Sequence, residues 1–159
     1  MAASKRIAGR ADWQDVGLGG VRRWLAPLAV EGTVTGMDLV VDAFPNEPDL
    51  RFTVLLLYSR CVMRLEYAVH VRHRNHPVRG AFVPAGVPLG WVVGPHCHRW
   101  TDNRALGRGD ALPEVLEFAI PLPPAVRGFD NASRWFCGEA EITCTSEELP
   151  RLLPRETLL

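Results

Sequence analysis

Lysine is almost absent from this chain of 159 residues, which has a single lysine, Lys5, and 17 arginines. Nearly every basic side chain can therefore hold a carboxylate or a phosphate through two parallel hydrogen bonds, which a lysine cannot do. The 18 basic residues are balanced by 18 acidic residues, so the net charge is zero. This balance excludes a uniformly basic nucleic-acid binder, although it allows a local basic surface.

Long apolar runs are also missing. No run reaches the roughly 20 residues of a membrane-spanning helix, and the N-terminal segment lacks the apolar core of a signal peptide. We therefore expect a cytoplasmic protein with no membrane partner. The ordinary content of apolar residues (47%) and charged residues (23%) predicts one domain over 1–159, with residues 1–17 and 150–159 peripheral.

Several catalytic signatures are absent. There is no Walker loop and no Gly-x-Ser-x-Gly elbow, and the chain has only four serines, at 4, 59, 133 and 146. No two cysteines have the close spacing of a zinc knuckle or a redox motif. We therefore expect reduced, mostly buried thiols at the four cysteine positions, Cys61, Cys97, Cys137 and Cys144.

The basic residues are concentrated in the middle of the chain. The segment from Arg60 to Arg108 contains eight arginines and two acidic residues, Glu66 and Asp102, and so carries a charge of +6. All five histidines also lie in it, at positions 70, 73, 76, 96 and 98. This segment is where a functional site is expected.

The apolar pattern predicts an α+β fold. Helical spacing indicates helices at 20–28 and 131–139, and a Gly- and Pro-rich stretch at 80–95 indicates a structured hairpin loop or short strands. The expected strands are 33–43, 51–58, 60–72, 96–102, 116–122 and 142–145. We expect a curved, mainly antiparallel sheet of about five to seven strands with one or two packed helices.

Two of these strands carry polar faces. Alternation along 60–72 places Arg64, His70 and Arg72 on one face, and the short gap after 51–58 indicates a tight antiparallel hairpin. We expect 60–72 and 96–102 to be neighbours, because both have a polar face and a Gly-rich hairpin joins them. Their polar faces would then line one cleft.

The segment 96–102 contains the sequence His96-Cys97-His98. Histidines at i and i+2 of a strand project side by side, roughly 6–7 Å apart at Cα, and could hold one metal ion. His70 and Asp102 are the candidates for further ligands, giving three histidines and one carboxylate. The alternative is that these histidines only form hydrogen bonds in a polar cleft, so no cofactor is the leading expectation and one divalent transition metal is the alternative.

The stretch from Gly90 to Gly109 resembles the first motif of the cupin family. The spacing of that motif is matched by Gly90, then five residues, His96-x-His98, three residues, Asp102, six residues and Gly109. The family has Glu at the position of Asp102, and its second motif adds a later histidine, whereas no histidine follows residue 98 here. The resemblance implies a metal-dependent enzyme in which His70 would supply the missing ligand.

A longer stretch, from 72 to 142, resembles an uncharacterised prokaryotic family associated with bacteria and their mobile elements. The matching parts are GPHCHRW at 94–100, FAIPL at 118–122, and a closing helical segment from Phe129 to Ile142. The family usually has Tyr at the position of Trp100. The resemblance implies an Arg/His-bearing strand, a Gly-rich hairpin and a closing helix, and it implies no activity.

Arginines interleaved with aromatic residues suit RNA or single-stranded nucleic acid, because guanidinium groups hold phosphates and rings stack on bases. They also suit an acidic protein surface or a nucleoprotein partner. The leading hypothesis is a small binding protein of bacterial or mobile-element origin. Its candidate binding residues are Arg64, His70, Arg72, Arg74, His96, His98, Arg99, Trp100 and Arg104.

An enzyme is the competing hypothesis. Besides the cupin-like metalloenzyme, a metal-independent histidine ribonuclease can be drawn from the residue types present. One of His70, His96 and His98 would remove the 2′-hydroxyl proton, another would protonate the leaving oxygen, and Arg72 or Arg99 would stabilise the developing charge.

Overall fold

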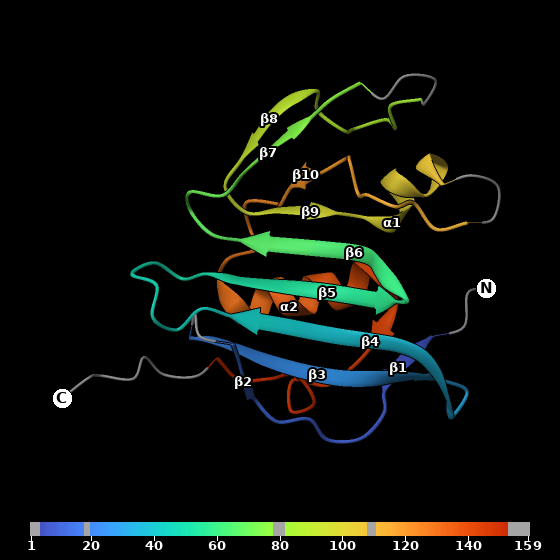
Figure 1. Ribbon diagram of the computed structural model, residues 1–159, viewed down its shortest axis with the longest axis vertical. Coiled ribbons are helices and arrows are strands. Elements are labelled where there is room, and N and C mark those ends of the chain that lie inside the picture. The colour runs from blue at the N-terminus through green and yellow to red at the C-terminus, as the bar shows by residue number, and fades with distance from the viewer. Residues whose placement is uncertain (1–3, 18–19, 78–81, 108–110, 153–159) are drawn as a thin grey trace.

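A nine-stranded sheet forms most of the molecule, and a separate two-stranded hairpin lies at one end of it (Figure 1). The computed structural model describes residues 4–17, 20–77, 82–107 and 111–152. Its strands are β1 (Lys5–Ile7), β2 (Gln14–Val16), β3 (Val21–Val30), β4 (Thr33–Ala43), β5 (Phe52–Tyr58), β6 (Arg60–Tyr67), β7 (Arg72–Asn75), β8 (Gly90–Val93), β9 (His96–His98), β10 (Ile120–Pro121) and β11 (Ile142–Thr143). Its helices are α1 (Trp100–Asn103), the 3-10 turn η1 (Arg104–Leu106) and α2 (Gly128–Glu139).

The main sheet has the strand order β10-β9-β6-β5-β4-β3-β1-β11, and β2 pairs with β3 outside this path. Its strand pairs are antiparallel, except that β1 and β11 run parallel. Among the described strands, β7 and β8 pair with each other and form a separate two-stranded sheet. The α+β class is confirmed, but the sheet is mixed and larger than the expected five to seven strands.

The central antiparallel strands agree with the sequence pattern. Strands at 33–43 and 51–58 are present as β4 and β5, and β5 forms the expected hairpin with β6. The helix expected at 131–139 lies within α2. The helix expected at 20–28 is wrong, because this segment is β3. In β3 the buried residues Trp24, Ala26 and Leu28 alternate with more exposed ones, which is the period of a strand with one buried face.

Several expected strands are shorter than predicted, including the one at 142–145, of which β11 covers only Ile142–Thr143. The strand expected at 60–72 ends at Tyr67, a turn follows, and β7 begins at Arg72. The strand expected at 96–102 ends at His98, where α1 takes over. In the segment 116–122 only Ile120–Pro121 is strand, because buried asparagine side chains, described below, bind the backbone just before it.

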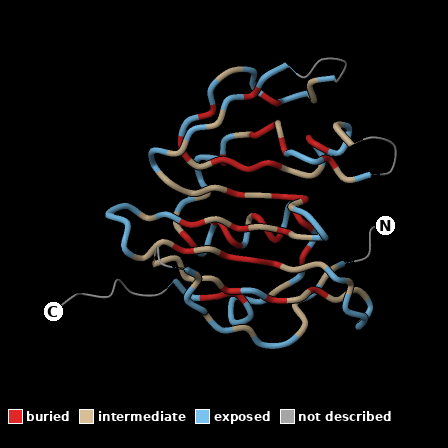
Figure 2. Tube along the Cα trace, viewed as in Figure 1, coloured by how far each residue is buried: buried red, intermediate tan, exposed pale blue. Residues whose placement is uncertain are grey.

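The main core lies between one face of the sheet and α2, which Figure 1 shows crossing behind the central strands. In Figure 2 buried residues follow those strands, while the β7–β8 hairpin is mostly half-buried or exposed. All four cysteines are free thiols, as expected; two are buried and two half-buried. Within the described part of the chain, none of the helices has the length and apolar character needed to cross a membrane.

Candidate functional site

The pairing of β6 with β9 brings four polar side chains together. Arg64 lies directly opposite His98, and Glu66 directly opposite His96. Opposite residues of a ladder share one face of the sheet. The expectation that these two strands are neighbours is therefore confirmed. The residue between the histidines, Cys97, faces the other way into the main core, where burial raises the pKa of its thiol.

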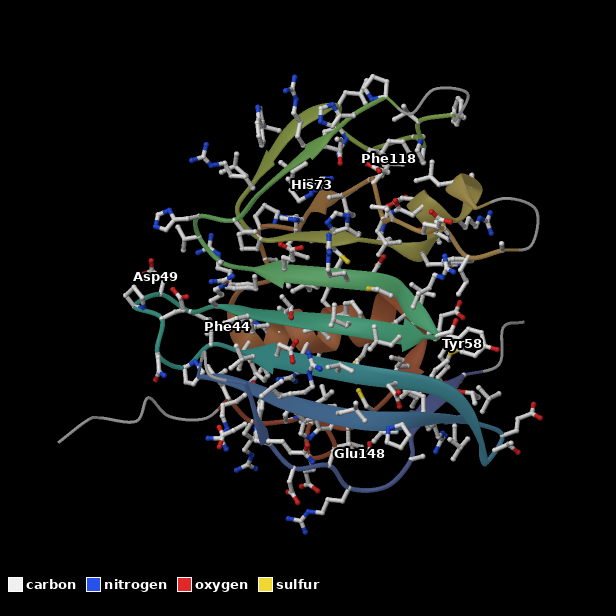
Figure 3. The ribbon with its side chains drawn as sticks, viewed as in Figure 1. Phe44, Asp49, Tyr58, His73, Phe118 and Glu148 are labelled. Carbon is white, nitrogen blue, oxygen red and sulfur yellow. The ribbon has the colours of Figure 1, made fainter. Side chains whose placement is uncertain are left out.

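The β7–β8 hairpin supplies a third histidine. His73 lies on the hairpin face that is turned toward the sheet, and Figure 3 shows it beside β10 and β9. Its ring is 4.5 Å from that of His98 and 5.8 Å from that of His96, measured between ring centroids. The rings of His96 and His98 are 5.3 Å apart. One ring nitrogen of each of the three histidines lies within 4.8 Å of the others. We call these residues the histidine cluster.

Hydrogen bonds fix which nitrogen of each ring carries the proton. His73 donates from Nε2 to the Glu117 carbonyl oxygen at 2.7 Å, and His96 donates from Nδ1 to the Gly94 carbonyl oxygen at 2.9 Å. The Nε2 atom of His98 is 3.2 Å from an Nη2 of Arg64, and a guanidinium can only donate. The lone pairs therefore lie on Nδ1 of His73 and on Nε2 of the other two rings.

Burial keeps the His-x-His pair neutral. The exposed fraction is 1% for His96 and 0% for His98. Burial, followed by the positive charge of Arg64, lowers the pKa of His98 to about 2. Burial also lowers the pKa of His96, although the Gly94 carbonyl and Glu66 oppose the change. A neutral imidazole is the form that binds metal ions.

An ion pair lies at the edge of the histidine cluster. Arg64 Nε is 2.9 Å from Glu66 Oε1, and Glu66 Oε2 is 3.9 Å from His96 Nε2. The side chains of Arg64 and Glu66 are 37% and 26% exposed. Solvent therefore reaches the histidine cluster from this side. Among the described residues, Glu66 has the only carboxylate within ion-pair distance of a histidine of the cluster.

The outer face of the hairpin is basic and aromatic. Arg72 and Arg74 are exposed on β7, opposite Val93 and Trp91 on β8. The Arg74 guanidinium lies over the Trp91 ring, 5.6 Å from its centroid, and Trp91 is 62% exposed. The sequence contains no acidic residue from 67 to 101. The outer face therefore carries two exposed arginines beside an exposed ring, and the hairpin itself contributes no acidic side chain.

Two buried asparagines hold the segment beneath the hairpin. Asn75 donates to the carbonyl oxygens of Pro88 and Ala119 and accepts from the Ala119 N–H. Asn103 binds Phe118 in the same two-way manner. Both side-chain amides thus act as short replacements for a neighbouring strand. They fix the hairpin and α1 against one stretch of backbone.

His70 does not join the cluster. Its side chain is 84% exposed, and its Nε2 atom lies 3.6 Å from a carboxylate oxygen of Asp49. Figure 3 shows Asp49 in a loop at the edge of the molecule, far from His73. The turn after Tyr67 breaks the alternation on which the prediction for His70 depended, so the expectation that it meets His96 and His98 is wrong.

The segment after β9 separates from the histidines. Asp102 is buried, and both its oxygens accept hydrogen bonds from Arg99, at 2.7 and 3.1 Å, so Asp102 is not available as a metal ligand. Arg99, Trp100 and Arg104 instead line a groove of about 590 Å³ on the α2 side of the sheet, together with Met63 and other apolar residues. Gly109 lies outside the described residues. The predicted binding residues thus fall into separate groups.

Sequence reasoning missed His73 and Glu66 as members of the site, and it missed the two asparagines. Within β7, His73 and Arg74 point to opposite faces, as the alternation of a strand requires. However, no glycine, proline or asparagine marks the turn that precedes this strand. Trp91 is not among the missed residues, because it belongs to the aromatic residues that the sequence interleaves with the arginines.

Comparison with known proteins finds no family model, no curated protein and no solved structure that matches this chain.

Proposed function

We propose that this protein binds single-stranded nucleic acid, RNA in the first place, through the outer face of the β7–β8 hairpin. The observation that carries the proposal is the cross-strand pair of Arg74 and Trp91, exposed on a hairpin that has no carboxylate of its own. A base stacked on an exposed ring contributes about 1–3 kcal/mol, whichever base it is. Phosphates on either side of that base can be held by the neighbouring guanidinium groups.

The spacing of the side chains supports this function. Arg72 and Arg74 are two residues apart on one strand and so lie roughly 7 Å apart, close to the distance between successive phosphates of an extended strand. Val93, two residues after Trp91 on the same face of β8, is 65% exposed and extends the apolar surface beside it. The hairpin lies at one end of the molecule (Figure 1), and the side chains of its outer face are exposed.

The histidine ribonuclease has less support. Acid–base catalysis needs imidazoles that reach the 2′-hydroxyl and the leaving oxygen within hydrogen-bond distance. His96 and His98 are almost completely buried, and His70 is on another surface. We therefore propose binding without cleavage.

Fluorescence anisotropy of a labelled U-rich RNA oligonucleotide tests the proposal. Binding by the wild-type protein should weaken steeply between about 50 and 200 mM salt, because counterions are released from the phosphates. Replacing Arg72 and Arg74 by alanine should reduce the slope of log K against log salt by about 1.4, since each phosphate contact on a single strand contributes about 0.7. Trp91→Ala should weaken binding roughly 5- to 150-fold.

The matched control is the double variant Arg127→Ala/Arg134→Ala, which removes two exposed arginines at the start of and within α2. It changes the net charge equally and should leave affinity within about twofold. Equal losses for both double variants, or no binding of RNA by the wild type at low salt, would contradict the proposal. Tighter binding of polyglutamate than of RNA would also contradict it, in favour of an acidic protein partner.

A further inference from the structure

The histidine cluster has the donors of a transition-metal site. One nitrogen of each of His73, His96 and His98 lies within 4.8 Å of the others, and two of the three rings are fully buried. Nitrogens bound to one tetrahedral zinc ion at about 2.0–2.1 Å are roughly 3.4 Å apart, so binding requires the rings to move together by at most about 1.4 Å. We propose that these three histidines bind one divalent transition-metal ion, of the zinc class, between the hairpin and the main sheet.

The surrounding hydrogen bonds prepare two of the rings for this role. Metal-binding histidines usually donate their other N–H to a carbonyl or carboxylate, which fixes the tautomer and the ring orientation. His73 and His96 each donate to a backbone carbonyl in this way, to Glu117 and to Gly94. The free nitrogen of His96, Nε2, is buried and has no hydrogen-bond partner within the part of the chain that the structure describes. A buried acceptor without a donor is unfavourable, and a bound cation would satisfy it.

The ion pair beside the cluster sets the affinity. Glu66 is the nearest carboxylate, with Oε2 3.9 Å from His96 Nε2, and is the candidate for the fourth ligand. Arg64 acts in the opposite direction, because it donates to His98 Nε2 and its charge repels a cation. An incoming ion must displace this guanidinium. Arg64 is partly exposed and can turn toward solvent while it keeps its contact with Glu66.

The ion would join two sheets that share no backbone ladder. His73 belongs to the hairpin, whereas His96 and His98 belong to β9 of the main sheet. Binding to the folded state alone stabilises it, and a free zinc concentration of 100 times Kd should raise the melting temperature by about 5–10 °C. The same strand that presents His73 inward presents Arg72 and Arg74 outward, so the ion would also hold the basic face in position. The metal site does not depend on whether that face binds RNA.

Titration of the EDTA-dialysed full chain with Co²⁺ tests the proposal. The wild-type protein should bind one equivalent, with the visible d–d bands of a four-coordinate ion, and Zn²⁺ should displace it. His73→Gln should weaken Zn²⁺ binding at least 100-fold in a chelator competition. His70→Gln is the matched control, since it removes an exposed histidine outside the cluster, and its affinity should equal that of the wild type.

The ion-pair variants separate a designed site from chance binding by imidazoles. Arg64→Gln should bind Zn²⁺ at least tenfold more tightly, and Glu66→Gln at least tenfold more weakly. The wild-type stoichiometry stands without any variant, so a failure of His73→Gln to fold does not block the test. Less than 0.1 equivalent of Co²⁺ or Zn²⁺ at micromolar concentrations would overturn the proposal. Equal losses for His70→Gln and His73→Gln would also overturn it.

Discussion

Replacing Asn75 by alanine tests how the β7–β8 hairpin is held. The side chain is 1% exposed and makes three hydrogen bonds, at 2.6, 2.7 and 2.8 Å, to Pro88 and Ala119. Each bond contributes about 1 kcal/mol net, and the Ala119 N–H and carbonyl would lose their partners in a buried place. We expect Asn75→Ala to lower the free energy of unfolding by about 3–5 kcal/mol.

Urea denaturation measures this loss, and amide hydrogen exchange places it in the structure. The Ala119 amide is bound by Asn75, whereas the neighbouring Phe118 amide is bound by Asn103. If the hairpin opens locally, a loss of about 3 kcal/mol makes the Ala119 amide exchange more than 100-fold faster. The exchange of the Phe118 amide should change less, and Asn103→Ala should reverse this order.

An exposed asparagine provides the control. Asn131 lies on the solvent side of α2, and Asn131→Ala should change stability by no more than about 0.5 kcal/mol. A loss below about 1 kcal/mol for Asn75→Ala, with unchanged exchange of the Ala119 amide, would refute the claim that this side chain replaces a strand.

Three further predictions concern buried groups. The fold lowers the pKa of His98, so on acidification the unfolded chain binds a proton before the folded chain does. The stabilisation that neutral His98 contributes is therefore complete above about pH 6.5. In the metal-free protein, about 2–3 kcal/mol of the free energy of unfolding should be lost between about pH 6.5 and 4.5. Urea titrations at several pH values should show a smaller loss in His98→Gln than in His70→Ala, since His96, whose pKa burial also lowers, is present in both variants. A pH-independent wild-type curve would contradict the prediction. Arg99→Ala leaves the buried carboxylate of Asp102 without its bidentate partner and should lower the free energy of unfolding by about 1–3 kcal/mol. In the same assay, the double variant Arg99→Ala/Asp102→Asn should recover part of that loss. Cys97 is fully buried with a raised pKa, so a thiol reagent at pH 8 should modify it only after denaturation; peptide mapping that finds it modified in the native protein would contradict its placement in the core.

The sequence pattern predicts the centre of the sheet well, because β4 and β5 contain short apolar runs and α2 has the helical spacing of its buried residues. It fails at β3, where apolar residues satisfy both a helical and an alternating pattern. Pairing with β4, β1 and β2 selects the strand there. The choice between helix and strand in this segment therefore depends on pairing with distant parts of the chain. The local spacing of apolar residues carries no information about that pairing.

The candidate site shows the same limit. His96 and His98 could be predicted, because a pair separated by one residue on a strand shares one face whatever lies around it. The third histidine could not, since continuing the alternation of β6 through the unmarked turn selects His70 instead of His73. A shift of one residue moves every following side chain to the opposite face. The contacts of Asn75 were also invisible, because their partner lies 44 residues away.

The most direct test of the proposed function is a pair of ¹H–¹⁵N NMR spectra of the full chain, recorded with and without a short U-rich RNA. We predict that the largest shifts fall on the indole N–H of Trp91 and on the backbone amides of β7 and β8. Unchanged hairpin signals at saturating RNA, or shifts confined to the groove that Trp100 lines, would contradict the assignment of this face as the nucleic-acid-binding surface.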